Sequence, residues 1–239
     1  MKTTLKAFLI LALSLGFHSL AQASIYVDVG SQLSFGNGPG TDAGRFVTTG
    51  VTSSSDSFTP FDTFCTETGV SQFINFTDTY KVVAIGTQTS GRPGDLSTSK
   101  TLVPIAAWAY TQFRNGDNSA NGLTGFDFDT ASTASSRDSA NSLQNLIWGS
   151  LGYTGTDASA ARTLWESNYA DAVSGGSWDS NSIGNVRIMQ LTNLAGTVTK
   201  QDQLVLIPVP EAGSLVIWTL LATSVVAGLA YQWRESTSN

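Results

Sequence analysis

The chain has 239 residues and a formal net charge of -6, with 12 lysines and arginines against 18 aspartates and glutamates. This acid excess argues against nucleic acid as a partner, because binding to a phosphate backbone needs a basic face. The only histidine is His18 and the only cysteine is Cys65. Beyond the first 23 residues, therefore, no Ser-His-Asp or Cys-His site can form, nor a histidine-rich zinc site or an intramolecular disulfide.

The first 23 residues have the pattern of a secretory signal peptide. Two lysines precede an apolar segment at 7–16, and Ala21 and Ala23 occupy the small positions of a cleavage site. We therefore expect cleavage after Ala23, which makes Ser24 the first residue of the exported protein. The alternative is an uncleaved membrane anchor.

Short segments rich in β-branched and aromatic residues, bounded by Gly, Ser or Asp, predict strands. They lie at 25–29, 45–51, 58–67, 70–76, 80–85, 185–191 and 203–207, and residues 30–44 form a glycine-rich loop between the first two. The middle of the chain changes to a helical period, which predicts helices over 104–113, 135–153 and 157–173. Strands, then helices, then strands indicate one α+β domain over 24–208: an antiparallel β-sandwich or barrel with a helical insertion of about three helices.

The last thirty residues have the features of a membrane-sorting segment. Val209-Pro210-Glu211-Ala212 precedes an uncharged, apolar-rich stretch at 213–233, and Arg234 follows it. A run of about 20 such residues is long enough to cross a bilayer as a helix. A basic residue after the span places the short end in the cytoplasm and the bulk of the chain outside. We thus predict one C-terminal transmembrane helix at 213–233.

This end resembles the PEP-CTERM sorting signal of Gram-negative exoproteins, in which a Pro-Glu-Pro motif precedes a membrane helix and a basic end. Here Ala212 stands where the second proline is usual, and the basic cluster is reduced to Arg234. The resemblance implies that residues 209–239 are recognised by an exosortase, a membrane-embedded transpeptidase that removes the tail after export through the secretion machinery. It implies a single-pass intermediate in the inner membrane and then a protein of the cell surface or the extracellular biofilm matrix. The alternative is a permanently anchored structural protein.

Two segments carry candidate chemistry. One is Thr63-Phe64-Cys65-Thr66-Glu67 at the end of a predicted strand, and the other is Leu143-Gln144-Asn145-Leu146-Ile147-Trp148 in a predicted helix. They resemble the paired motifs of bacterial thioester domains, which are surface adhesion modules. The resemblance extends to exported PEP-CTERM proteins with a similar Phe-Cys-x-Glu strand and a last strand like 201–206.

The resemblance implies an internal thioester between Cys65 and Gln144, formed with loss of ammonia. Phe64, Glu67 and Trp148 are the supporting residues by the same motifs. Such a bond needs an activated sulfur, dipoles that stabilise an oxyanion and close positioning of the two side chains. Glu67 and Asp138 are both candidates for the proton transfer. Opened by an amine on a surface or matrix molecule, the bond would leave a covalent amide link.

A purely structural interpretation competes with the thioester. Cys65 can be a small buried hydrophobe, Trp148 can be helix packing, and Gln144 can bond a nearby backbone group. Whether Cys65 and Gln144 touch is left open by the sequence.

Weaker candidates complete the sequence. Asp117-Asn118-Ser119-Ala120-Asn121-Gly122 has the spacing of half a calcium loop, but Phe128 stands where the bidentate glutamate belongs, so an Asx-rich turn explains it and we predict no metal site and no cofactor. Four tryptophans could stack on sugars, and Asp127 and Asp129 form a carboxylate pair; aromatic residues at helical spacing more often fill a core. These tryptophans are Trp108, Trp148, Trp165 and Trp178. We predict a non-enzymatic adhesion or structural module with a polysaccharide or surface amine as ligand; the alternative is a carbohydrate-binding module or a carboxylate-based glycan hydrolase.

Overall fold

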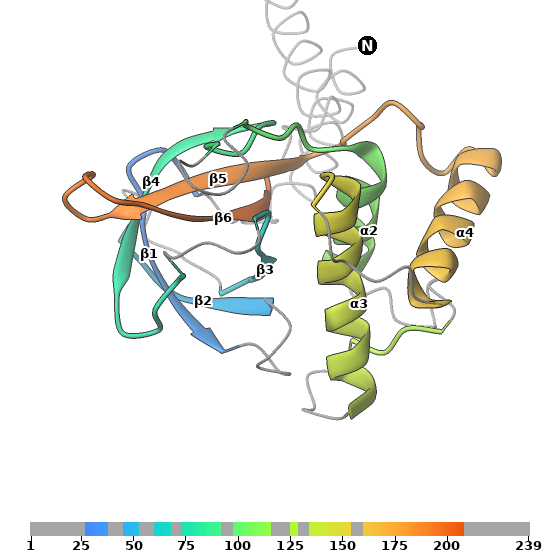
Figure 1. Ribbon diagram of the computed structural model, residues 1–239, viewed down its shortest axis with the longest axis horizontal. Coiled ribbons are helices and arrows are strands. Elements are labelled where there is room, and N and C mark those ends of the chain that lie inside the picture. Colours follow the sequence, from blue (N-terminus) through green and yellow to red (C-terminus); the bar gives the residue numbers. More distant parts are fainter. Residues whose placement is uncertain are drawn as a thin grey trace, which may run out of the picture. The chain divides into compact units, whose positions relative to one another are not determined.

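A computed structural model describes residues 27–37, 45–52, 60–67, 73–91, 98–115, 125–128, 134–153 and 160–207. All of them belong to one compact unit, 25–207, which combines an antiparallel sheet with three helices in an α+β arrangement (Figure 1). The helices of these residues are too short or too polar to cross a membrane. The predicted signal peptide, its cleavage site at 21–24 and the sorting segment at 209–239 lie outside the described residues.

Six strands form one sheet in the order β3-β2-β1-β4-β5-β6, and all neighbouring pairs are antiparallel. The strands are β1 (Gln32–Asn37), β2 (Arg45–Thr52), β3 (Asp62–Phe64), β4 (Thr79–Gly86), β5 (Val186–Asn193) and β6 (Thr199–Leu206). A tight turn joins β5 to β6: Gly196 adopts a left-handed φ of 72° and its N–H bonds to the carbonyl of Asn193.

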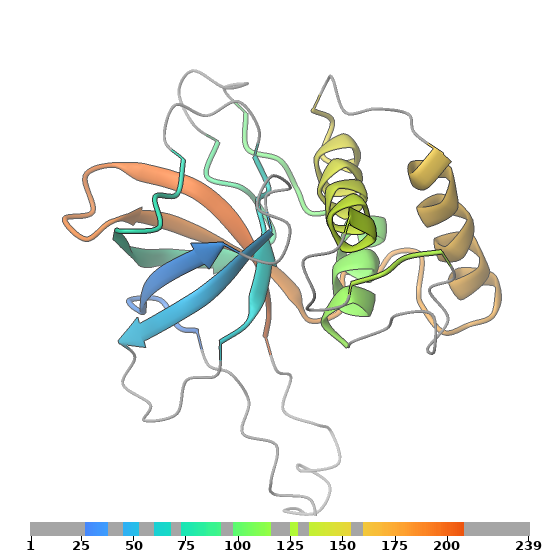
Figure 2. The ribbon, with the colours of Figure 1, turned by 90° about the horizontal axis from the view of Figure 1, so that it is seen from below.

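The sheet curls until its two edge strands approach each other (Figure 2). Just beyond β3, Cys65 forms an isolated antiparallel bridge with Gln203 of β6. The N–H of Thr66 donates to the carbonyl of Asp202 over 3.0 Å, and the hydroxyl of Thr63 donates to the carbonyl of Leu204 over 2.6 Å. We refer to this junction, residues 63–67 against 201–204, as the seam.

The three helices follow one another between β4 and β5. They are α2 (Pro104–Arg114), α3 (Ala134–Ser150) and α4 (Ala160–Ser174). Pro104 begins α2, where its missing N–H costs nothing, and Arg114 in the last turn complements the helix dipole. Leu143 and Ile147, one turn apart on α3, are both fully buried, so this helix presents an apolar face to the core.

Two clusters of buried side chains divide the core. One lies within the curl of the sheet, where Leu33, Phe35, Tyr80 and Met189 are almost completely excluded from solvent. The other joins the helices to the sheet; its members on the sheet are Phe64, Val186, Ile188 and Leu204. Each fully buried side chain of this size contributes about 1.5 to 3 kcal/mol of transfer free energy. The seam residue Cys65 follows directly on Phe64 and is therefore fixed between a rigid strand and the helical layer.

The three predicted helices and the strands at 45–51, 80–85, 185–191 and 203–207 are confirmed to within a few residues. The first predicted strand is wrong: its described residues from Val27 are not a strand, and β1 occupies part of the predicted loop at 30–44. Gly36 suggested a loop, yet it lies in β1, where it pairs with Val47 of β2. A side chain there would meet the methyl group of Thr49 at 3.0 Å, which favours glycine at this position.

Two other predicted strands are corrected. The strand expected at 58–67 shortens to Asp62–Phe64. Next to it, Phe61 accepts the main-chain N–H of Thr48 and also bonds the hydroxyl of Thr48 through its own N–H and carbonyl. Residues 73–76, the described end of the expected strand at 70–76, are irregular. There the phenol of Tyr80 bonds both the N–H and the carbonyl of Asn75, which takes the place of strand pairing.

Candidate functional site

The candidate site is the seam around Cys65. Its side chain is 1% exposed and that of Gln203 is fully buried. The short strand β3 carries Cys65 to the seam, and β6 carries Gln203 to the facing position. A thiol and a carboxamide are thus enclosed together in a buried site.

Gln144 of α3 reaches the backbone of Cys65. Its Oε1 accepts the N–H of Cys65 over 3.1 Å, and its Nε2 donates to the carbonyl of Cys65 over 2.7 Å. Both ends of the amide are therefore used to satisfy main-chain groups that β3 leaves unpaired where it ends. The structure brings together the two residues that the sequence singled out, and the contact it forms is between the amide and the main chain.

The amide of Gln203 contacts the sulfur of Cys65. Its Nε2 donates to Sγ of Cys65 over 3.4 Å and lies at the same distance from the carbonyl of Gln201. The hydroxyl of Thr63 lies 3.5 Å from Oε1 of Gln203. The hydrogen bond to Sγ places the sulfur beside Nε2, which is one covalent bond from the amide carbon of Gln203.

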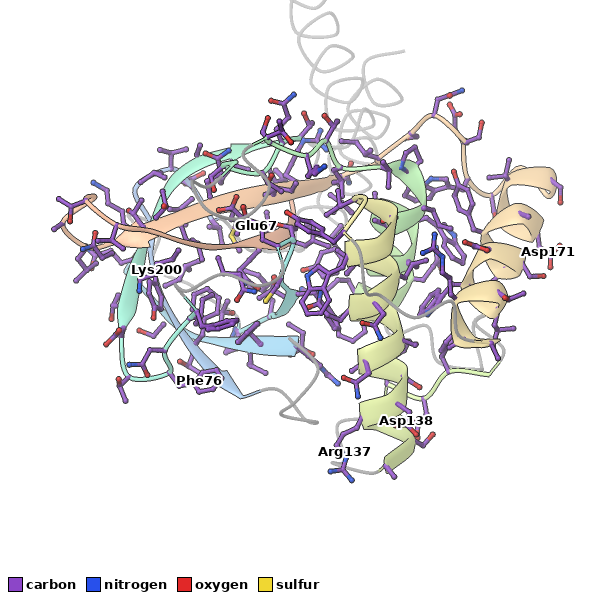
Figure 3. The ribbon with its side chains drawn as sticks, in the orientation of Figure 1. Glu67, Phe76, Arg137, Asp138, Asp171 and Lys200 are labelled. Atoms are coloured by element: carbon purple, nitrogen blue, oxygen red, sulfur yellow. The ribbon has the colours of Figure 1, made fainter. Side chains whose placement is uncertain are left out.

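Glu67 lies on the other side of the same bridge and is 3% exposed. Its Oε2 accepts the N–H of Asp202 over 3.1 Å, and its own carbonyl accepts Nε2 of Gln201 over 2.8 Å. Figure 3 shows Glu67 within the sheet, whereas Asp138 lies at the outer end of α3, on the surface. Of the two candidates for proton transfer, only Glu67 is part of the seam.

Phe64 and Trp148 support the site in different ways. Phe64 is fully buried and packs edge-on against Phe113 of α2, with ring centroids 5.1 Å apart, which anchors the strand just before Cys65. Trp148, one turn after Gln144, packs against the helical core cluster while partly exposed. Its indole Nε1 is buried without a hydrogen-bond partner among the described residues.

Gln203 and Thr63 were not predicted as site residues. The signal for Gln203 was the segment 201–206, which carries part of the resemblance to exported PEP-CTERM proteins. Pairing of this strand with residues more than a hundred positions earlier cannot be inferred from periodicity, which reports local structure alone.

The remaining candidates fall in different places. Residues 117–122 and Asp129 lie outside the described residues, and within the described ranges no three His, Cys, Asp or Glu side chains gather as metal ligands. Trp108 and Trp165 are buried in the helical core in an edge-on pair, so they serve packing. Trp178 covers Gly184, and its indole N–H donates to the carbonyl of Ser182.

No protein-family model matches the chain, and no curated protein or solved structure matches it either.

Proposed function

We propose that this protein is an exported surface or matrix module that carries an internal thioester between Cys65 and Gln203 and uses it once, to form a covalent link to an amine. The observation that carries the proposal is the contact of the Gln203 amide with the Cys65 sulfur at 3.4 Å inside a closed site. Buried cysteines usually pack against apolar groups, and a polar amide directed at the sulfur is the feature that packing alone does not require.

The chemistry balances without a cofactor. Sγ of Cys65 bonds to Cδ of Gln203, the bond from Cδ to Nε2 breaks, and the nitrogen leaves as ammonia with the thiol proton. An incoming amine later attacks Cδ, the carbon–sulfur bond breaks, and Cys65 recovers a thiol while an amide forms on Gln203. The hydroxyl of Thr63 lies 3.5 Å from Oε1 but donates its proton to the carbonyl of Leu204 over 2.6 Å, so it would have to turn from that carbonyl to stabilise the oxyanion of either step.

Gln203 replaces Gln144 as the acyl donor in this proposal because of what each amide already binds. The amide of Gln144 is held by two hydrogen bonds to the main chain of Cys65, of which the shorter is 2.7 Å. Attack on its carbon would expel Nε2 and leave the buried carbonyl of Cys65 without this donor, at a cost of about 1 to 3 kcal/mol. The contacts of Gln203 are longer and include the sulfur itself.

The test is the intact mass of the purified protein. We expect the unaltered protein to weigh one ammonia less than its sequence mass. The Cys65→Ala and Gln203→Met variants should each have their full sequence mass. Full sequence mass in the unaltered protein, with a thiol that titrates after unfolding, would contradict it.

The two ends of the chain support export and sorting. We propose cleavage after Ala23, and removal of the tail from Val209 onward by an exosortase-type transpeptidase. To test this, the protein is expressed in a bacterium with and without an exosortase, and the N- and C-terminal residues of the released protein are determined. Release that needs the enzyme and is lost in Glu211→Ala supports sorting, whereas a full-length membrane protein in both hosts supports a permanent anchor.

The proposed role is non-enzymatic, since the acyl group is consumed by the reaction. The two carboxylates buried beside the bridge are used by main-chain donors: Glu67 accepts from Asp202, and Asp202 accepts the N–H of Ser90 over 2.6 Å. This is a structural use of the charges, which is consistent with an adhesion module rather than with a glycan hydrolase.

A further inference from the structure

The seam is the most weakly paired junction of the sheet. Every neighbouring pair of strands forms a ladder of at least three residue pairs, whereas β3 and β6 are joined by an isolated bridge, that of Cys65 with Gln203, next to which the N–H of Thr66 bonds to the carbonyl of Asp202. The side chains of Cys65 and Gln203, which are proposed to react, meet at this junction. Side-chain hydrogen bonds therefore help to hold β6 against residues 63–67.

Glu67 binds β6 through two groups, its side-chain carboxyl group and its main-chain carbonyl. Its carboxylate binds the N–H of Asp202, the residue before Gln203, and its carbonyl receives the amide of Gln201. It stands two positions after Cys65, so both contacts lie directly beside the bridge, on one side of it. Both hydrogen bonds are buried, and burial removes the competition from water.

We propose that Glu67 is a positioning residue, which holds the seam closed so that the sulfur of Cys65 stays against the amide of Gln203 until the two react. This inference rests on the thioester proposed above. Glu67 acts through the main chain of Asp202. Its loss should therefore make the seam open more often.

Exposure of the sulfur measures seam opening directly. The Gln203→Met chain cannot form a thioester, and it leaves Cys65 as the only cysteine of the protein, so its labelling by iodoacetamide under native conditions reports access. In that chain, Glu67→Ala removes the carboxylate bond, and Glu67→Gln keeps an acceptor oxygen of similar shape without the charge. We expect labelling to accelerate about ten-fold in Glu67→Ala and less in Glu67→Gln.

Thr48→Val is the matched control. Thr48 is fully buried, and its hydroxyl bonds both the carbonyl and the N–H of Phe61, so the substitution weakens the attachment of the same segment on its other side, to β2. A general loss of stability would accelerate labelling in this variant as well. Labelling that stays near the parent rate in Thr48→Val supports a specific effect of Glu67.

Hydrogen exchange supplies a second readout that does not need the alanine variant to fold. In Glu67→Gln, exchange of the Asp202 amide should accelerate several-fold while that of Ile188, within the β5–β6 ladder, stays unchanged. In chains that retain Gln203, ammonia release should slow in Glu67→Ala and recover in part in Glu67→Gln.

The outcomes separate the two proposals. Equal labelling and equal exchange of the Asp202 amide across the three residues at position 67 would overturn the role of Glu67. A chain that never loses ammonia would instead overturn the thioester, and the labelling series in the Gln203→Met chain would still decide whether Glu67 closes the seam.

Discussion

The side-chain amide of Gln144 forms two hydrogen bonds with the backbone of Cys65, which lies 79 positions earlier in the chain. The pairing imitates one rung of a β-ladder, with a helix side chain in place of a strand. It fixes the main chain of Cys65 at the point where β3 ends. The sulfur is thereby left to meet Gln203 from the other strand of the seam.

Replacement of Gln144 by Glu should slow formation of the thioester and destabilise the fold by about 2 to 3 kcal/mol. The new oxygen would face the carbonyl of Cys65, where Nε2 now donates over 2.7 Å. Ammonia release after refolding and the denaturation midpoint measure the two effects. Gln190→Glu is the control, because its amide also donates to a main-chain carbonyl, that of Gln88, but on the surface. Equal behaviour of the two variants would contradict the role of Gln144.

The thioester should act as a cross-link between the edge strands. Cys65 and Gln203 are separated by 138 positions, and closing a loop of this size in the unfolded chain stabilises a protein by up to about 4 to 5 kcal/mol. Treatment with methylamine opens the bond without changing the sequence, so the treated protein should unfold at lower denaturant than the untreated one. Gln203→Met, which lacks the bond from the start, should not respond to methylamine. An unchanged midpoint in the treated protein would mean that no cross-link was present.

Replacement of Asp62 by Asn should cost about 2 to 3 kcal/mol of stability. The side chain of Arg45 is 3% exposed, its Nη2 pairs with Asp62 over 2.6 Å, and its Nε and Nη1 have no hydrogen-bond partner among the described residues. Loss of the carboxylate leaves a buried charge without its counter-ion. Chemical denaturation measures the loss. The exposed pair of Arg162 and Glu166 is the comparison, where Glu166→Gln should cost only a few tenths of a kcal/mol.

Stability should fall in strong alkali through Tyr110. Burial raises the pKa of this phenol from 10.0 to about 12, since the phenolate would be desolvated. The folded state therefore holds the proton more tightly than the unfolded state. Its contribution is fully present below pH 10 and is lost as the pH rises from 10 to about 12, by roughly 2 to 3 kcal/mol.

The Cys65→Ala chain is the one to titrate, because it has no thioester to hydrolyse. In Tyr110→Phe the decline over this pH window should become shallower, although the variant is less stable at neutral pH through loss of the bond to the carbonyl of Asp62. Parallel stability curves for the two chains between pH 10 and 12 would exclude Tyr110 as the cause.

Local pattern and long-range pairing differ in how far they can be predicted from this sequence. The helices were predictable because Leu143, Ile147 and their neighbours repeat at helical spacing, and burial of that face stabilises them. Strand β1 was not, since Gly36 is typical of loops and the strand is defined by its pairing with β2 and β4. Cys65 and Gln144 could be singled out from their motifs, and they do meet.

The role of each amide depended on tertiary structure. Which glutamine faces the sulfur is decided by the curl of the sheet, which brings Gln203 to Cys65 across the seam. No local signal encodes that pairing. Glu67 was singled out from its motif, but its contact with the main chain of Asp202 was not predictable, because a motif records side chains and not the main chain that they bind.

The most direct measurement locates the methylamine adduct. The purified protein is incubated with methylamine, digested, and sequenced by fragmentation mass spectrometry, with Cys65→Ala treated in parallel. A methylamide on Gln203 of the unaltered protein, absent from Cys65→Ala, is the predicted result. A methylamide on Gln144, or no adduct on either glutamine, would contradict the assignment of Cys65 and Gln203 as the reacting pair.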